Sequence, residues 1–84
     1  MKEKLKYVYK KYGYYNDKVE LTLKYLFCNR KAEKKARGLA REIVSENRKE
    51  FLHVFWGYKK QVLKDDYNIE WRTPVELNPR IKFN

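Results

Sequence analysis

The sequence has few of the residues from which catalytic and metal sites are usually built. It contains one cysteine, Cys28, and one histidine, His53, so a single chain can form neither a disulfide nor a two-histidine metal site. Ser45 is the only serine, and the three glycines are isolated, so no nucleophile turn or phosphate-binding glycine loop is present. We therefore expect a protein that is not an enzyme, with no catalytic residue, metal or cofactor.

Long apolar runs are also absent. No stretch approaches the roughly 18–20 apolar residues that cross a bilayer, and the first residues lack the apolar core of a signal peptide. Together with the single cysteine, this indicates a reducing, intracellular environment. We expect a cytoplasmic protein with no membrane span.

What the chain does have is positive charge and aromatic rings. Lys and Arg total 21 of the 84 residues against 11 acids, which gives a formal net charge of +10, and aromatic residues make up 17%. A chain of this length forms one domain, and its aromatic content is too high for a disordered tail. The charge favours a polyanionic partner: nucleic acid, an anionic membrane surface or an acidic protein.

The first part of the chain has the pattern of β-strands. Residues 5–15 are rich in Tyr and Val, Asn16-Asp17 is typical of a turn, and alternate residues from Val19 to Phe27 are apolar. We expect a β-hairpin over residues 5–27.

The period then becomes helical. Apolar residues recur every three to four positions from Ala32 to Val44, after Asn29, which is a favourable N-cap. This predicts an amphipathic helix over residues 30–50.

Residues 51–58 fit two patterns. Aromatic and β-branched residues together with Gly57 favour a strand, whereas a helix would gather Phe51, Phe55, Tyr58 and Val62 into one stripe. We favour the strand. Residues 67–72 alternate again and indicate a further strand.

The fold class predicted from these elements is α+β, with β-β-α-β-β order. A mainly antiparallel sheet would carry one amphipathic helix across one face. This single domain would cover residues 1–73. Because Pro74 and Pro79 cannot donate to a central ladder, residues 74–84 would form an extended C-terminal arm or edge strand.

The predicted helix carries a strip of positive charge, which we call the basic strip. Like charges four residues apart oppose helix stability, and no acid shares the strip, because Glu42 and Glu46 fall on the opposite flank of a continuous helix. A locally unfavourable pattern favours a functional explanation, here neutralisation of phosphates. The alternative is a solvated surface of a Lys/Arg-rich protein. The basic strip consists of Arg30, Lys34, Arg37, Arg41 and Arg48.

Aromatic residues would also lie on the sheet face that the helix leaves open. Such a face could stack on the bases of a single strand or form a homodimer in which two sheets pack together. We favour the dimer, or a sheet that curls on itself, over base stacking. The candidate stacking or interface residues are Tyr12, Tyr14, Phe51, Phe55, Trp56 and Trp71.

These features predict a small basic nucleic-acid-binding protein, accessory or regulatory, that contacts the phosphates of DNA or RNA. The alternative is a protein-interaction module, an inhibitor or adaptor, that docks on an acidic protein partner through Trp and Tyr anchors. Binding to an anionic membrane surface ranks third, because the apolar face of the predicted helix has no large anchoring aromatic residue.

Overall fold

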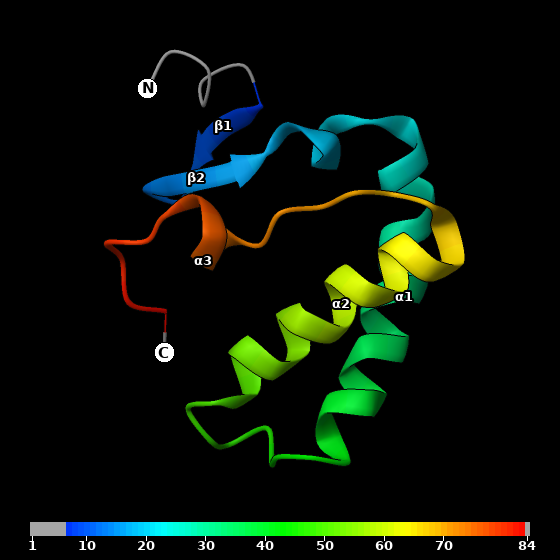
Figure 1. Cartoon of the computed structure of the whole chain (residues 1–84), viewed down its shortest axis with the longest axis vertical. Helices are drawn as coiled ribbons and strands as arrows, with labels where there is room; N and C mark the ends of the chain where they lie inside the picture. Colours follow the sequence, from blue (N-terminus) through cyan, green and yellow to red (C-terminus); the bar gives the residue numbers. More distant parts are fainter. Residues whose placement is uncertain (1–6, 84) are drawn as a thin grey trace.

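The chain folds into two long antiparallel helices with a β-hairpin beside one end of the pair (Figure 1). The structure, a computed structural model, describes residues 7–83. The elements in chain order are β1 (Val8–Lys11), β2 (Tyr14–Asp17), the 3-10 helix η2 (Lys18–Leu21), α1 (Leu23–Arg41), α2 (Phe51–Tyr67) and α3 (Pro74–Leu77). The prediction of a small α+β fold with an antiparallel sheet is confirmed. The predicted β-β-α-β-β order with one helix is wrong, because the described residues form two strands and three α-helices.

A two-residue turn closes the hairpin of β1 and β2. Tyr12 and Gly13 have φ angles of 59° and 82°. Two successive positive φ angles are the geometry of a type I′ turn, which suits the twist of an antiparallel hairpin. The predicted hairpin over residues 5–27 is therefore too long at its C-terminal end, and its residues 5 and 6 lie outside the described residues.

The residues predicted as the turn instead end β2. Asn16 and Asp17 are buried, and Asp17 lies opposite Val8 in the sheet register. The Asp17 carboxylate accepts hydrogen bonds from the backbone N–H groups of Val19 (3.0 Å) and Arg72 (2.8 Å). It thus caps η2 and fixes the later chain segment to the hairpin.

Helix α1 begins earlier than predicted. Thr22 is its N-cap, with a side-chain oxygen that accepts from the backbone N–H of Tyr25 at 3.3 Å. The strand predicted over residues 19–27 is wrong, because the helix buries Tyr25 and exposes Leu23 and Phe27, which the strand would have buried with it.

Helix α1 also ends before the predicted boundary at residue 50. After Arg41 the chain makes turns, in which Ser45 accepts from the backbone N–H of Asn47 through its hydroxyl (3.3 Å) and from that of Arg48 through its carbonyl (3.0 Å). Residues 42–50 form a connection that returns the chain alongside α1 (Figure 1).

Residues 51–67 form α2 and not the predicted strand. Buried residues recur at helical spacing, at Phe51, Phe55, Lys59 and Val62. A helix satisfies its own backbone hydrogen bonds, so this stripe can pack on α1 without a partner strand. The helix ends at Asn68, whose φ of 54° is the left-handed conformation common at helix C-termini.

Small residues bring α1 and α2 together. Ala32, Ala36 and Ala40 are fully buried on one face of α1. The rings of Phe51 and Phe55 pack against Ala36 and Ala40 and stack with their centroids 6.1 Å apart. This alanine face points toward α2, so the opposite face of α1 points to solvent.

Beyond α2 the chain returns to the hairpin in extended form (Figure 1). The alternation predicted for residues 67–72 holds for burial, since Ile69 and Trp71 are buried while Glu70 and Arg72 are exposed. The predicted strand is wrong, because this segment pairs with neither of the described strands.

The predicted extended arm starts instead with one turn of helix, α3. Thr73 and Glu76 form a reciprocal capping box around Pro74, which suits the first position of a helix. Asn78 then ties α3 to β2: its side-chain amide accepts from the backbone N–H of Tyr15 and donates to the Tyr15 carbonyl, both at 2.8 Å. A buried side chain thus pairs with β2 as a neighbouring strand would.

Candidate nucleic-acid interface

The outward face of α1 carries most of the basic strip. Its helical members span about 16 Å of axis at 1.5 Å per residue. They are all exposed: Arg30, Lys34, Arg37 and Arg41. The fifth member, Arg48, lies in the connection after α1, where its Nε forms an ion pair with Glu50 at 3.3 Å.

One acid reaches the helical part of the basic strip, contrary to the sequence prediction. Because α1 ends at Arg41 and the chain turns back, Glu46 contacts both Arg37 and Arg41 at 2.9 Å. Hydrogen bonds from Arg41 and Arg37 hold the pKa of the Glu46 carboxyl below its usual range. The Arg37 guanidinium also lies 5.0 Å from the centroid of the Phe55 ring. This end of the strip is therefore fixed in position and partly neutralised.

The other end of the basic strip keeps its full charge. Neither Arg30 nor Lys34 forms an ion pair with any residue among 7–83, and both are exposed. Glu33 lies between them in sequence, but its carboxylate turns inward and accepts from Lys59 at 3.1 Å. Lys24 and Lys31 are exposed on the adjoining surface. The cations of α1 that form no ion pair within residues 7–83 therefore all lie in the part of the helix up to residue 34.

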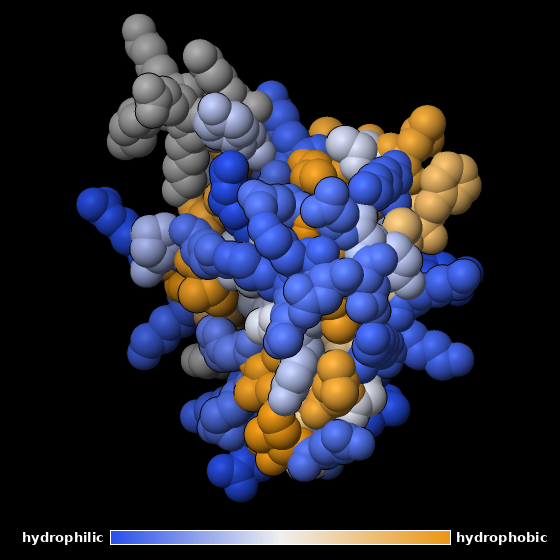
Figure 2. Space-filling model, turned by 45° about the vertical axis from the view of Figure 1, so that its right-hand side comes forward, coloured by the Kyte–Doolittle hydropathy of each residue, from blue (hydrophilic) through white to orange (hydrophobic). Residues whose placement is uncertain are grey.

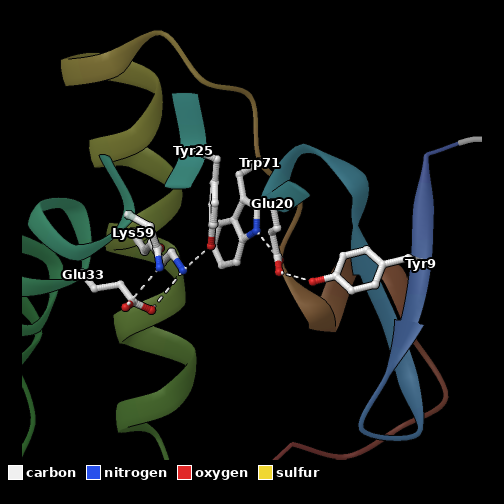
Figure 3. A network of polar contacts seen from close by, with 7 residues as sticks. Tyr9, Glu20, Tyr25, Glu33, Lys59 and Trp71 are labelled. Carbon is white, nitrogen blue, oxygen red and sulfur yellow. Dashed lines mark hydrogen bonds and ion pairs between the residues drawn. The ribbon is translucent and has the colours of Figure 1, made fainter. Parts of the chain in front are cut away.

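A buried cation fixes α1 against α2 (Figure 3). Lys59 of α2 is only 5% exposed and donates to the Tyr25 hydroxyl at 2.7 Å as well as to Glu33. Its Nζ lies 4.5 Å from the centroid of the Trp71 ring. Burial lowers the pKa of the Lys59 ammonium, and the charge of Glu33 opposes that shift. Sequence reasoning missed this cluster, whose only signal is a lysine within the apolar stripe of α2.

A second set of hydrogen bonds extends this contact to the hairpin (Figure 3). Glu20 of η2 accepts from the Trp71 indole N–H at 2.8 Å and from the Tyr9 hydroxyl at 3.0 Å. Burial and the hydrogen bond to Glu20 raise the pKa of Tyr9 to about 12. The carboxylate thus joins the hairpin, η2 and the segment after α2, and it holds the start of α1 in place.

Most predicted stacking residues are part of the core or the sheet edge. Phe51, Phe55 and Trp71 are buried, and the half-buried Tyr14 and Trp56 both pack edge-on against Phe83. The broad sheet face expected to stack on bases or to dimerise is not among the described elements, because the sheet has two strands. Tyr12, at 77% exposure, is the one predicted stacking ring that is mostly exposed. Its ring lies near Tyr14 and Lys11, in the hairpin turn and away from α1 (Figure 1).

The other chemically reactive side chains are dispersed. Cys28 is half-buried against the core, and His53 is exposed and packs edge-on to Trp56. Within residues 7–83, no group of three or more His, Cys, Asp or Glu side chains could hold a metal ion. No helix in the same range is long and apolar enough to cross a membrane.

Comparisons with protein-family models, with curated proteins and with solved structures gave no match to this chain.

Proposed function

We propose that this protein binds nucleic acid by contacting phosphates along the outward face of α1. The observation that carries the proposal is the row of cations on one face of a rigid helix, two of which, Arg30 and Lys34, have no acidic partner in residues 7–83. The row spans about 16 Å, which is about five base-pair steps at 3.4 Å each.

Arg37 and Arg41 support this function in a different way. Glu46 holds both guanidinium groups at 2.9 Å, so their orientation is set before a ligand arrives. A phosphate can replace part of the Glu46 contact, because all three side chains are about half exposed. Contacts to phosphates carry little sequence information, so we propose modest sequence specificity for DNA or RNA.

The alternative, docking on an acidic protein through Trp and Tyr anchors, has weaker support from its two tryptophans. Trp71 is buried in the polar cluster of Figure 3, and Trp56 packs against Phe83, so neither ring is free to fill a partner's pocket.

Salt dependence tests the proposal. With four phosphate contacts, the logarithm of affinity should fall with that of salt at a slope of about −3.6, or about 150-fold between 50 and 200 mM. The double variant Arg30→Gln/Lys34→Gln should reduce the slope to about −1.8. Binding would be measured with labelled single- and double-stranded DNA and RNA.

The matched control is Lys35→Gln/Lys64→Gln. It removes the same charge from two exposed lysines whose partners, Asp66 and Glu70, lie outside the basic strip. The control should keep the slope of the unmodified protein. Equal slopes for both double variants would show that only net charge matters and would reject the α1 face as the site.

A further inference from the structure

Three large apolar side chains project into solvent where α1 begins. Leu23, Leu26 and Phe27 are 71%, 60% and 79% exposed, and Leu21 of η2 is 60% exposed just before them. Figure 2 shows hydrophobic side chains standing out at the upper right of the molecule, where α1 begins, with hydrophilic side chains beside them. We call Leu23, Leu26 and Phe27 the apolar tip.

The apolar tip has no role in the fold or in phosphate binding. Residues 23, 26 and 27 lie on the outward side of α1, opposite the buried alanines, and so do not pack on α2. Phosphate contacts need cations and hydrogen-bond donors, and the side chains of Leu and Phe supply neither. Exposing neighbouring large apolar groups is unfavourable, and such patches typically mark an interaction surface.

The charges around the apolar tip identify what it would bind. Lys24, Arg30, Lys31 and Lys34 are exposed within residues 24–34 of α1, and the sequence has no acid between Glu20 and Glu33. This combination, apolar groups surrounded by cations, matches the boundary between hydrocarbon and anionic headgroups in a lipid bilayer. The long lysine stems can lie along the apolar layer while their ammonium groups reach the headgroups.

We propose that the apolar tip inserts into the surface of an anionic membrane while these cations contact lipid headgroups. A fluid bilayer accepts separate projecting side chains without a shaped recess, which a folded protein partner would have to provide. A second copy of this chain is a poor occupant, because it would bring the same cations against each other. The expected binding is peripheral and reversible.

Membrane binding ranked third in the sequence analysis because the apolar face of the predicted helix had no large aromatic anchor. That helix was predicted to begin at residue 30. The helix begins at Leu23, so Phe27 becomes an exposed helical residue close to the cations. Aromatic and leucine side chains beside Lys and Arg are typical of helices that bind at the interface.

Vesicle co-sedimentation tests the inference. We expect the protein to bind vesicles with about 30% phosphatidylserine and not those of phosphatidylcholine alone, because the cations need anionic lipid. Leu23→Gln/Phe27→Gln should reduce partitioning at least about tenfold, since each removes apolar contact with hydrocarbon. Both side chains are exposed, so the fold should be unchanged by circular dichroism. The matched control is Ile43→Gln, because Ile43 is also apolar and 63% exposed but lies outside the apolar tip. This variant should bind vesicles like the unmodified protein.

The same variants separate this inference from nucleic-acid binding. Leu23→Gln/Phe27→Gln should leave nucleic-acid affinity unchanged, whereas Arg30→Gln/Lys34→Gln should weaken vesicle binding about thirtyfold, at about fivefold per cation. Absence of vesicle binding, or equal binding by Leu23→Gln/Phe27→Gln, would overturn the inference. So would light scattering showing that the unmodified protein is a dimer and this variant a monomer, because the tip would then join two copies.

Discussion

The buried ammonium of Lys59 allows a quantitative test of how the helices are held together. The change Glu33→Gln keeps the shape of the side chain and removes the negative charge 3.1 Å from Lys59 Nζ. Breaking a buried ion pair from one side costs about 3–5 kcal/mol, because a charge stays buried without its partner. Since the Glu33 side chain is 38% exposed and water can replace part of its contact, we expect a loss of about 1.5–2.5 kcal/mol in the free energy of unfolding.

A companion variant removes the buried ammonium and its hydroxyl partner together and leaves Glu33, whose side chain is 38% exposed, in contact with water. Lys59→Met/Tyr25→Phe deletes both the ammonium and the hydroxyl that accepts from it at 2.7 Å. Replacing buried polar partners by apolar groups of similar shape is often neutral or stabilising. We therefore expect this variant to unfold within about 1 kcal/mol of the unmodified protein, or at higher denaturant. Urea titrations followed by far-UV circular dichroism and by tryptophan fluorescence would measure both, since the Trp71 ring lies 4.5 Å from Lys59 Nζ.

The buried Lys59 should also make the free energy of unfolding depend on pH. Because burial lowers the pKa of Lys59 in the folded state below the ordinary 10.5, the unfolded state binds more protons between these two values. The stability of the unmodified protein should therefore rise with pH in that window, until ionisation of unfolded tyrosines near pH 10 reverses the trend. Lys59→Met/Tyr25→Phe should lack the rise. If Glu33→Gln were as stable as the unmodified protein, the ammonium would not depend on Glu33 as argued. A loss of more than about 3 kcal/mol in the companion variant would contradict the expectation that apolar groups can replace the ammonium and the hydroxyl.

Two further predictions concern the hairpin. Because the pKa of Tyr9 is raised to about 12 from 10.0, its contribution to stability is complete below pH 10 and is lost between pH 10 and 12. In Tyr9→Phe the free energy of unfolding should fall less steeply over that range, by about 0.5–1 kcal/mol per pH unit after allowance for partial exposure. Urea titrations at alkaline pH would measure this slope, and an unchanged slope would contradict the prediction. Tyr12→Asn should raise the free energy of unfolding by about 0.5–1 kcal/mol, because Asn before Gly13 tolerates the positive φ better than Tyr, and a lower melting temperature would contradict it.

The sequence predicts the hairpin and the first long helix, but it assigns the wrong kind of element to residues 19–27 and 51–58. The helical period after residue 30 corresponds to α1. The apolar alternation at residues 19–27 does not mark a strand, because an amphipathic helix starts after Thr22. Residues 51–58 fit both a strand and a helix, and packing against α1 decides between the two. The local sequence does not show which surface these residues will pack on. The alternation of Ile69 and Trp71 is correct for burial, because an extended segment that packs on one side has the same period as a strand.

The candidate nucleic-acid interface was likewise predicted only in part. Outward placement of the cations follows from the position of the alanines in the helix, which the sequence alone provides. The contact of Glu46 with Arg37 and Arg41 depends on the chain turning back after α1, and helical periodicity carries no signal for that reversal. The apolar tip was not predicted, because the incorrect strand prediction placed Leu23 and Phe27 in the core.

The amide of Asn78 has a consequence for the order in which the chain folds. Its hydrogen bonds to Tyr15 close a loop of 63 residues, whereas α1 and α2 meet across a short connection. Closing a long loop costs more chain entropy, and contacts distant in sequence generally form later. We expect the helix pair to assemble first and the two ends of the chain to join last. An Asn78→Ala change should then accelerate unfolding more than it slows folding.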